Sequence, residues 1–189
     1  MSIKDLNIGK KIFLGIGASL ILTMIIMGFL VNHQFNNLGE KNINSVQEFL
    51  LAKEKSRIKN TTETAAQFMS ELYTKNKNNF SEKGLEELLR DYNKDLNFGE
   101  VGYFFIYDQQ GNTISFPPSP KDVGKNKWDF QDENGKYIVR NLSETAKKGG
   151  GFVEYLFSKP GTSEEIKETK ITYVHPIKGT DYFIGAGTY

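Results

Sequence analysis

An uncharged apolar stretch near the N-terminus constrains the fold of this chain more than any other feature. Residues 12–31 contain no charged side chain, and Ser19 and Thr23 carry their only hydroxyl groups. At about 1.5 Å per residue, a helix of this length spans the roughly 30 Å hydrocarbon layer of a membrane. A buried helix of a soluble protein would normally carry a polar stripe, which is absent here. The pattern predicts a transmembrane helix from Ile12 to Val31.

The end of this stretch argues against a cleaved signal peptide. A signal peptide has a shorter apolar region, of about 7–15 residues, and small residues at its cleavage site. Here the stretch ends in Phe29-Leu30-Val31 and continues with Asn32 and His33. We therefore expect an uncleaved anchor.

Charges on either side of the stretch predict its orientation. Lys4, Lys10 and Lys11 precede it with a single Asp5, and no charged residue follows it before Glu40. The positive-inside rule keeps the first eleven residues in the cytoplasm, so that everything after the helix lies outside it. The absence of cysteine suits an exported domain that forms no disulfides.

The composition offers little for catalysis or nucleic-acid binding. The formal net charge is +1, which gives no electrostatic attraction for a polyanion. The only histidines, His33 and His175, lack metal-site spacing. Glycines 149–151 follow a predicted helix and precede a predicted strand, the reverse of a phosphate-binding loop, and so predict a helix C-cap. We expect no enzyme activity, no cofactor, no metal site and no nucleic-acid partner.

A long stalk helix is predicted over residues 35–75, continuing the membrane helix. No proline interrupts this range, and its apolar positions recur at spacings of three and four with one slip in register. They are Ile43, Val46 and Leu50, then Ile58, Thr61, Ala65, Phe68 and Leu72. Two interpretations of these apolar positions remain open: they form a parallel dimer seam along the first half of the stalk, or they form a single amphipathic face packed against a sheet.

The rest of the chain predicts an α+β domain. Ser81 is a reasonable N-cap for a short helix that ends near Tyr92, and a second helix is predicted over residues 136–148. Runs rich in β-branched and aromatic residues, separated by turn sequences, predict five strands. Their ranges are 103–107, 112–116, 152–157, 168–175 and 182–187. Hairpin-linked strands of this kind form an antiparallel sheet.

The sequence from Gly102 onward resembles a single Cache domain, the extracytoplasmic sensor module of bacterial chemoreceptors and sensor kinases. The stretches that carry the resemblance follow the family's order and spacing over nearly all of the last ninety residues. They are GYFFIYDQQGNTI (102–114), PSPKDVGKN (118–126), DENGKYIVRNL (132–142), AKKGGGFVEYLFSKPG (146–161), KITYVHPI (170–177) and YFIGAGTY (182–189). The resemblance implies a PAS-like five-stranded antiparallel sheet, with the ligand-binding domain over 35–189 and its sheet and pocket over 102–189.

The resemblance also implies a function. Such a domain would sense a small molecule for a methyl-accepting chemotaxis protein in the bacterial inner membrane and relay a helix displacement across it, as a homodimer through the stalk. The same input domain would serve a sensor histidine kinase or a cyclic-di-nucleotide enzyme. A pilin-like structural subunit is a weaker alternative, because the apolar helix contains no glutamate and no processing site is evident.

Two departures from the family pattern bear on these expectations. Family members often carry a histidine where this chain has Phe116, so any role of that histidine does not carry over. Relatives continue beyond the position of Tyr189 into a second membrane helix and a cytoplasmic signalling region.

A ligand pocket is predicted from strand alternation. Tyr103, Phe105 and Tyr107 share one face of their strand, and Phe104 and Ile106 share the other. We expect one of these faces to pack on the long helix and the other to line a cavity.

Three further residues are predicted to close this pocket: Trp128, Tyr155 and Lys170. Aromatic walls with one cation suit a small organic anion, because an ammonium pairs with a carboxylate and tyrosine hydroxyls donate hydrogen bonds to it. Short carboxylates are also the ligands that the resemblance implies. The competing interpretation is that the aromatic residues are ordinary core and that Lys170 is solvated at a strand edge.

Overall fold

A computed structural model describes residues 7–98, 102–160, 163 and 167–189. It contains two compact units, Met1–Leu51 and Ala52–Tyr189, which are described separately. Helix α1 (Ile8–Asn76) contributes its first part to one unit and residues 52–76 to the other.

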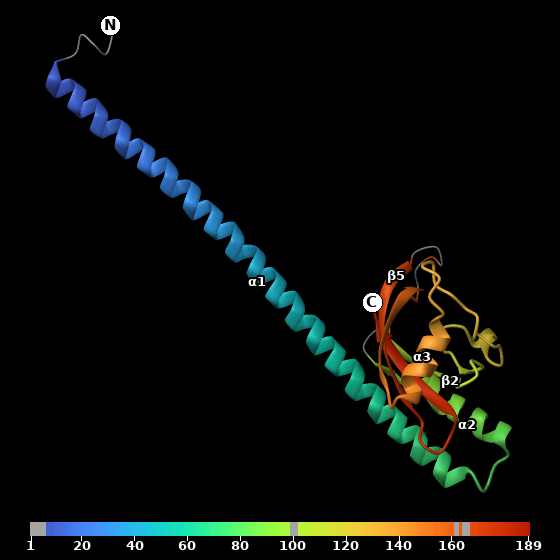
Figure 1. Cartoon of the computed structure of the whole chain (residues 1–189). Helices are drawn as coiled ribbons and strands as arrows, with labels where there is room; N and C mark the ends of the chain where they lie inside the picture. The colour runs from blue at the N-terminus through green and yellow to red at the C-terminus, as the bar shows by residue number, and fades with distance from the viewer. Residues whose placement is uncertain (1–6, 99–101, 161–162, 164–166) are drawn as a thin grey trace. The chain divides into compact units, whose positions relative to one another are not determined.

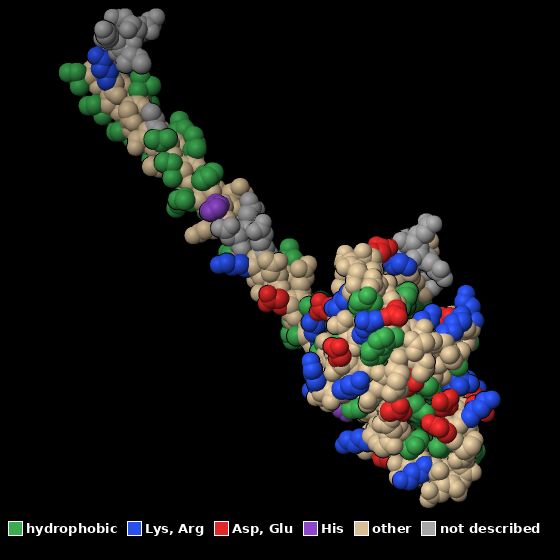
Figure 2. All heavy atoms as spheres, turned by 45° about the vertical axis from the view of Figure 1, so that its right-hand side comes forward, with side chains coloured by type: hydrophobic (Ala, Val, Ile, Leu, Met, Phe, Trp, Pro, Cys, Tyr) green, Lys and Arg blue, Asp and Glu red, His purple; other side chains and the backbone are tan. Residues whose placement is uncertain are grey.

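The first unit is the N-terminal part of α1. Within Ile8–Phe35 an 18-residue window has a mean hydropathy of 2.4, and the helix is long and apolar enough to cross a membrane. Its large apolar side chains are exposed, among them Phe13 and Phe29, and green hydrophobic side chains project along this segment in Figure 2. The predicted stretch 12–31 is therefore helical with an apolar surface, and its insertion into a membrane stays a prediction.

The second unit is built on an antiparallel sheet with the strand order β1-β2-β6-β5-β4, and β3 pairs with β2 (Figure 1). The strands are β1 (Asn97–Phe98), β2 (Gly102–Asp108), β3 (Thr113–Ser115), β4 (Gly151–Ser158), β5 (Lys167–Pro176) and β6 (Tyr182–Thr188). The antiparallel α+β fold is confirmed, and five of its strands were predicted. The short β1 was not, because two residues are too few to show the period-2 alternation that identifies a strand.

Helix α2 (Glu82–Asp95) begins where its sequence predicted. The Ser81 side chain accepts a hydrogen bond from the backbone N–H of Gly84 at 3.2 Å, which satisfies one of the free donors in the first turn. Leu85 and Leu89 are its buried apolar residues.

Helix α3 (Ile138–Lys147) ends at the glycine triplet. Gly149 and Gly150 have φ angles of +99° and +110°, which favour glycine. The expected C-cap is therefore present.

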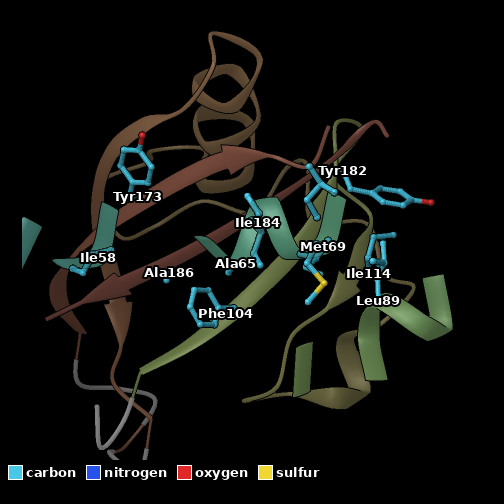
Figure 3. Close-up of a cluster of buried hydrophobic side chains, with 13 residues drawn as sticks. Ile58, Ala65, Met69, Leu89, Phe104, Ile114, Tyr173, Tyr182, Ile184 and Ala186 are labelled. Atoms are coloured by element: carbon cyan, nitrogen blue, oxygen red, sulfur yellow. The ribbon is translucent and has the colours of Figure 1, made fainter. Parts of the chain in front are cut away.

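One face of the sheet packs on residues 52–76 of α1 and on α2. Ile58, Ala65 and Met69 of α1 are buried against Phe104 and Ile184 in a single cluster (Figure 3). The stalk residues predicted as an amphipathic face therefore include members of the core.

The opposite face packs on α3. Ile138 and Leu142 of the helix are buried with Tyr103, Phe105 and Tyr107 of β2. The two faces of β2 thus divide as the alternation predicted, and the aromatic face is the one turned away from α1.

Candidate ligand-binding site

A cavity of about 90 Å³ lies on the α3 face of the sheet. Strands β2, β4 and β5, helix α3 and the loop between β3 and α3 supply its walls. Its lining residues are Tyr103, Phe105, Tyr107, Phe116, Asp122, Lys127, Phe130, Ile138, Val139, Leu142, Tyr155, Phe157 and Lys170.

Lys170 is the most unusual residue of this cavity, because only 1% of it is exposed. Its Nζ donates a 2.6 Å hydrogen bond to the hydroxyl of Tyr103. It also lies 4.2 Å from the ring centroid of Tyr103 and 5.3 Å from those of Phe157 and Tyr189. Aromatic faces attract a cation, but they replace only part of the hydration that the ammonium loses.

Among the residues that the structure describes, no acidic side chain pairs with this ammonium. The ion pairs among the described residues do not include Lys170. Burial lowers the pKa of Lys170 to about 7, since desolvation disfavours the charged form. A buried lysine without a counter-ion is uncommon and marks a candidate site for an anion.

Two glycines of β6 allow the lysine to reach across the sheet. Strand β6 lies between β5 and β2, yet the side chains of Lys170 and Tyr103 meet over it. A Cβ on Gly187 would lie 2.8 Å from Cε of Lys170, and one on Gly185 would lie 2.4 Å from the ring of Phe105. Because Gly185 and Gly187 have no side chains, they leave space on the cavity side of the sheet for the side chains of Phe105 and Lys170.

Three tyrosines lie near Lys170: Tyr103 accepts its hydrogen bond, the ring of Tyr189 lies 5.3 Å from its Nζ, and Tyr155 is its register partner on β4. The hydroxyl of Thr172 donates to that of Tyr155 at 3.0 Å, and the hydroxyl of Tyr189 donates to the carbonyl of Ser158 at 2.8 Å. Burial raises the pKa values of Tyr103 and Tyr155 and raises that of Tyr189 to about 12. These groups stay neutral at physiological pH, where they can offer hydrogen bonds but no negative charge.

Charged residues from the loop border the cavity. Asp122 accepts a 2.8 Å bond from Lys125 and lies 3.4 Å from the Nζ of Lys127. The bond from Lys125 lowers the pKa of Asp122 to about 2. Phe130 lines the same cavity although 46% of it is exposed. These loop residues therefore lie where the cavity meets solvent.

Five of the six predicted site residues line this one cavity: Tyr103, Phe105, Tyr107, Tyr155 and Lys170. Trp128 is not among its lining residues. Its ring lies 5.6 Å from the guanidinium carbon of Arg140, and its carbonyl accepts a bond from Nε of the same arginine. Trp128 thus holds the loop beside the cavity. Ligand contact by any of the six residues stays a prediction.

Several lining residues were missed from the sequence. Phe157 follows Tyr155 by two positions in β4, so strand alternation alone could have identified it. Asp122 and Lys127 come from a loop whose path has no periodic signal. Tyr189 beside Lys170 was also missed, because their meeting depends on the order of strands β5 and β6 in the sheet.

A larger groove of about 780 Å³ lies on the other side of the sheet, between α1 and the end of β5. Its lining includes Glu63, Gln67 and Lys75 of α1 together with His175. The carboxylate of Glu63 already accepts a 2.7 Å bond from Tyr173. The smaller cavity is the better candidate site, because it contains a buried lysine that has no acidic partner among the described residues.

Comparison with known proteins identifies the family. A model of the Cache domain, dCache_2, matches residues 30–189. The sensor histidine kinase MctS of Rhizobium johnstonii is 26% identical over 170 residues, which cover 90% of this chain and 36% of that protein. The methyl-accepting chemotaxis protein CtpM of Pseudomonas aeruginosa is 34% identical over 91 residues, 48% of this chain and 16% of that protein. The chain thus spans well under half the length of these curated relatives.

The fold has solved counterparts as well. A Cache chemosensory domain studied for carboxylic acid recognition superimposes with a TM-score of 0.67 at 23% identity, covering 75% of this chain and 97% of that one. At this identity the likeness concerns the fold. With the family model matched from residue 30 to the last residue, the chain belongs to the Cache domain family.

Proposed function

We propose that this Cache domain senses a short organic carboxylate, which binds in the cavity on the α3 face with its carboxylate against Lys170. The observation that carries the proposal is a buried ammonium with no acidic partner among the described residues. A bound carboxylate supplies the missing charge, and charge-assisted hydrogen bonds of this kind are about twice as strong as neutral ones.

The size and walls of the cavity support a small ligand. Its 90 Å³ corresponds to about three water molecules at their liquid volume of about 30 Å³ each. Phe105, Tyr155 and Leu142 give it apolar and aromatic walls that suit a short carbon chain. The fold neighbour that recognises carboxylic acids agrees with this assignment.

The proposed setting is a membrane receptor. The stretch Ile12 to Val31, within the apolar helical segment Ile8–Phe35, would anchor the chain, with residues 1–11 in the cytoplasm and the domain from residue 35 onward in the periplasm or outside the cell. A homodimer through the stalk would bring two sensor domains together. Ligand binding would favour one of two dimer states and displace a helix by about 1–2 Å.

Three outputs are compatible with this input domain. Chemotaxis signalling is the function we favour, because the relative with the higher identity is a methyl-accepting chemotaxis protein. A sensor kinase is the alternative, because a histidine kinase aligns with more of this chain. An input domain of a cyclic-di-nucleotide enzyme would use the same site. Membership in the Cache family argues against the pilin-like alternative.

Thermal unfolding of the whole chain in detergent micelles, with a panel of short carboxylates, tests the proposal. A ligand at about 100 times its dissociation constant adds roughly 2.7 kcal/mol to the free energy of unfolding. Trp128 is the only tryptophan of the chain and lies in the loop beside the cavity, so its fluorescence reports on the same event. Stabilisation by one or more carboxylates supports the site. No stabilisation by any member of the panel, at concentrations up to the millimolar range, would contradict it.

A further inference from the structure

We propose that the carboxylate site takes up a proton together with its ligand, so that carboxylate affinity weakens as the pH rises through neutrality. This inference rests on the proposed function and concerns how the same site is regulated. It follows from the surroundings of the one buried cation that the cavity contains.

The empty site provides little to hold a positive charge. Among the described residues, the Nζ of Lys170 donates one hydrogen bond, to the hydroxyl of Tyr103, whereas an ammonium has three donors. Its other described neighbours are aromatic rings, the nearest of them after Tyr103 being those of Phe157 and Tyr189 at 5.3 Å. Loss of the proton relieves the cost of a desolvated charge, and these neutral surroundings tolerate an amine.

The occupied site reverses this preference. A carboxylate that enters the cavity places a full negative charge beside the nitrogen, where water is excluded and the attraction is strong. The charge balance is simple: a neutral amine, a carboxylate anion and one proton from solvent give an ammonium paired with a carboxylate. Binding therefore raises the proton affinity of Lys170, and protonation of Lys170 raises the affinity for the carboxylate by the same factor.

Of the described groups that face Lys170, no other changes charge in the neutral range. Tyr103 on β2, Tyr155 on β4 and Tyr189 after β6 have pKa values raised by burial, so they remain neutral there. Asp122 in the loop has a pKa lowered to about 2 and remains an anion, salt-bridged to Lys127.

Strand β5 itself carries four more ionisable residues, Lys167, Glu168, Tyr173 and His175, and none of them lines the cavity. Glu168 lies two positions before Lys170 and is exposed. His175 lines the groove on the α1 side of the sheet and does not line the cavity. Lys170 is thus the described group of the cavity whose charge changes near neutral pH.

The size of the change in carboxylate affinity follows from the fraction of Lys170 that is protonated before the ligand binds. Burial lowers the pKa of Lys170 to about 7. The carboxylate binds the protonated form, so its apparent dissociation constant equals the intrinsic one divided by that fraction. The fraction falls from about 0.9 at pH 6 to about 0.09 at pH 8, which predicts an affinity about tenfold weaker at the higher pH. A small carboxylic acid is ionised throughout this range.

Isothermal titration of propionate into the whole chain in detergent micelles tests the inference. Titrations at about pH 8 in two buffers with different ionisation heats give the number of protons taken up, and titrations at about pH 6 give the change in affinity. We expect close to one proton per ligand at about pH 8 and about tenfold tighter binding at about pH 6.

A matched variant tests which residue takes up the proton when the carboxylate binds. His175→Gln removes the only other side chain of β5 that titrates near neutrality, and it lies outside the cavity. Proton uptake that persists in this variant supports Lys170 as its origin, and uptake that disappears overturns the inference.

The outcomes separate the two proposals. Binding of equal strength at both pH values without proton uptake overturns the proton linkage and leaves the proposed function standing. Absence of binding at either pH, for propionate and for the other carboxylates of the panel, removes the proposed function and the inference with it.

Discussion

The Nζ of Lys170 on β5 donates a 2.6 Å hydrogen bond to the hydroxyl of Tyr103 on β2, although strand β6 lies between these two strands. Both side chains therefore lie over β6, where Gly187 leaves room for the lysine chain. The resulting cavity contains a buried cation beside aromatic rings and the hydroxyl of Tyr103. This arrangement is the structural basis of the proposed carboxylate site.

Replacement of Gly187 by alanine should disrupt the site. The new Cβ would lie 2.8 Å from Cε of Lys170 and 2.5 Å from Oγ1 of Thr172, so both side chains must move. We expect overpacking to lower the free energy of unfolding by about 1–3 kcal/mol. We also expect propionate affinity to fall by about tenfold or more, or at least about 1.4 kcal/mol. Chemical denaturation and isothermal titration measure the two effects.

The matched control is Gly15→Ala, at a position where a Cβ would have no atom within 4 Å. It should leave both quantities unchanged within error. A Gly187→Ala variant that binds propionate as tightly as the original chain would show that Lys170 does not need its path across β6.

Replacement of Lys170 by methionine should separate stability from binding. Methionine keeps most of the length of the side chain but removes a charge that has no acidic partner in the described part of the chain, so the free energy of unfolding at about pH 7 should stay equal or rise. Propionate binding should be lost, because the counter-ion of the carboxylate is gone. A variant that loses about 3 kcal/mol or more of stability would indicate that Lys170 serves the fold itself.

The stability of the original chain should rise with pH above neutrality. The pKa of Lys170 is lowered to about 7 in the folded state and lies near its ordinary 10.5 in the unfolded state. Between these values the unfolded state holds more protons, so the free energy of unfolding increases by up to about 1.4 kcal/mol per pH unit. Denaturation between about pH 7 and pH 9 measures this slope, below the range in which tyrosines titrate.

Lys170→Met is the reference for that slope, since it retains every other titrating group. The stability difference between the original chain and this variant should change with pH in favour of the original chain. A difference that stays constant would mean that Lys170 does not titrate in this window.

Replacement of Asp122 by asparagine should strengthen carboxylate binding. Asp122 lines the cavity as an anion and repels a carboxylate that enters it. Its removal also frees Lys127, which lies 3.4 Å from it. We expect the dissociation constant for propionate to fall about two- to fivefold, and to fall less at high salt, because charges near the surface are screened. Weaker binding in this variant would show instead that Asp122 positions the loop for the ligand.

Replacement of Tyr173 by phenylalanine should affect the fold without affecting the site. Tyr173 donates a 2.7 Å hydrogen bond to Glu63 on the α1 face of the sheet, opposite the cavity. Loss of a bond to a charged acceptor should lower the free energy of unfolding by about 1.5–3 kcal/mol. Propionate affinity at a temperature where the variant is folded should stay within about twofold of the original. A larger change would indicate coupling between the two faces.

Local patterns in the sequence predicted most of the fold. The period-2 alternation from Tyr103 to Tyr107 correctly divided β2 between a face toward α1 and a face with the cavity. Ser81 correctly marked the start of α2, because its hydroxyl caps the free N–H groups of a helix. Strand β1 was not predicted, because its pairing with β2 depends on tertiary contact and not on its own two residues.

The candidate site was predictable only in part. Five of its residues come from strands, whose alternation fixes the face on which each side chain lies. Strand order was not available from the sequence, and it is strand order that brings Tyr189 and Tyr103 to Lys170. Trp128 was expected in the pocket because aromatic residues often line ligand sites, but its loop carries the ring to Arg140.

The most direct test of the central claim compares propionate with propionamide, its neutral isostere, by isothermal titration into the whole chain in detergent micelles at about pH 6, where Lys170 is mostly charged. Our account predicts saturable binding of propionate, at least about tenfold weaker binding of propionamide, and no binding of propionate to Lys170→Met. Equal binding of the acid and the amide, or unchanged binding of propionate to Lys170→Met, would contradict it.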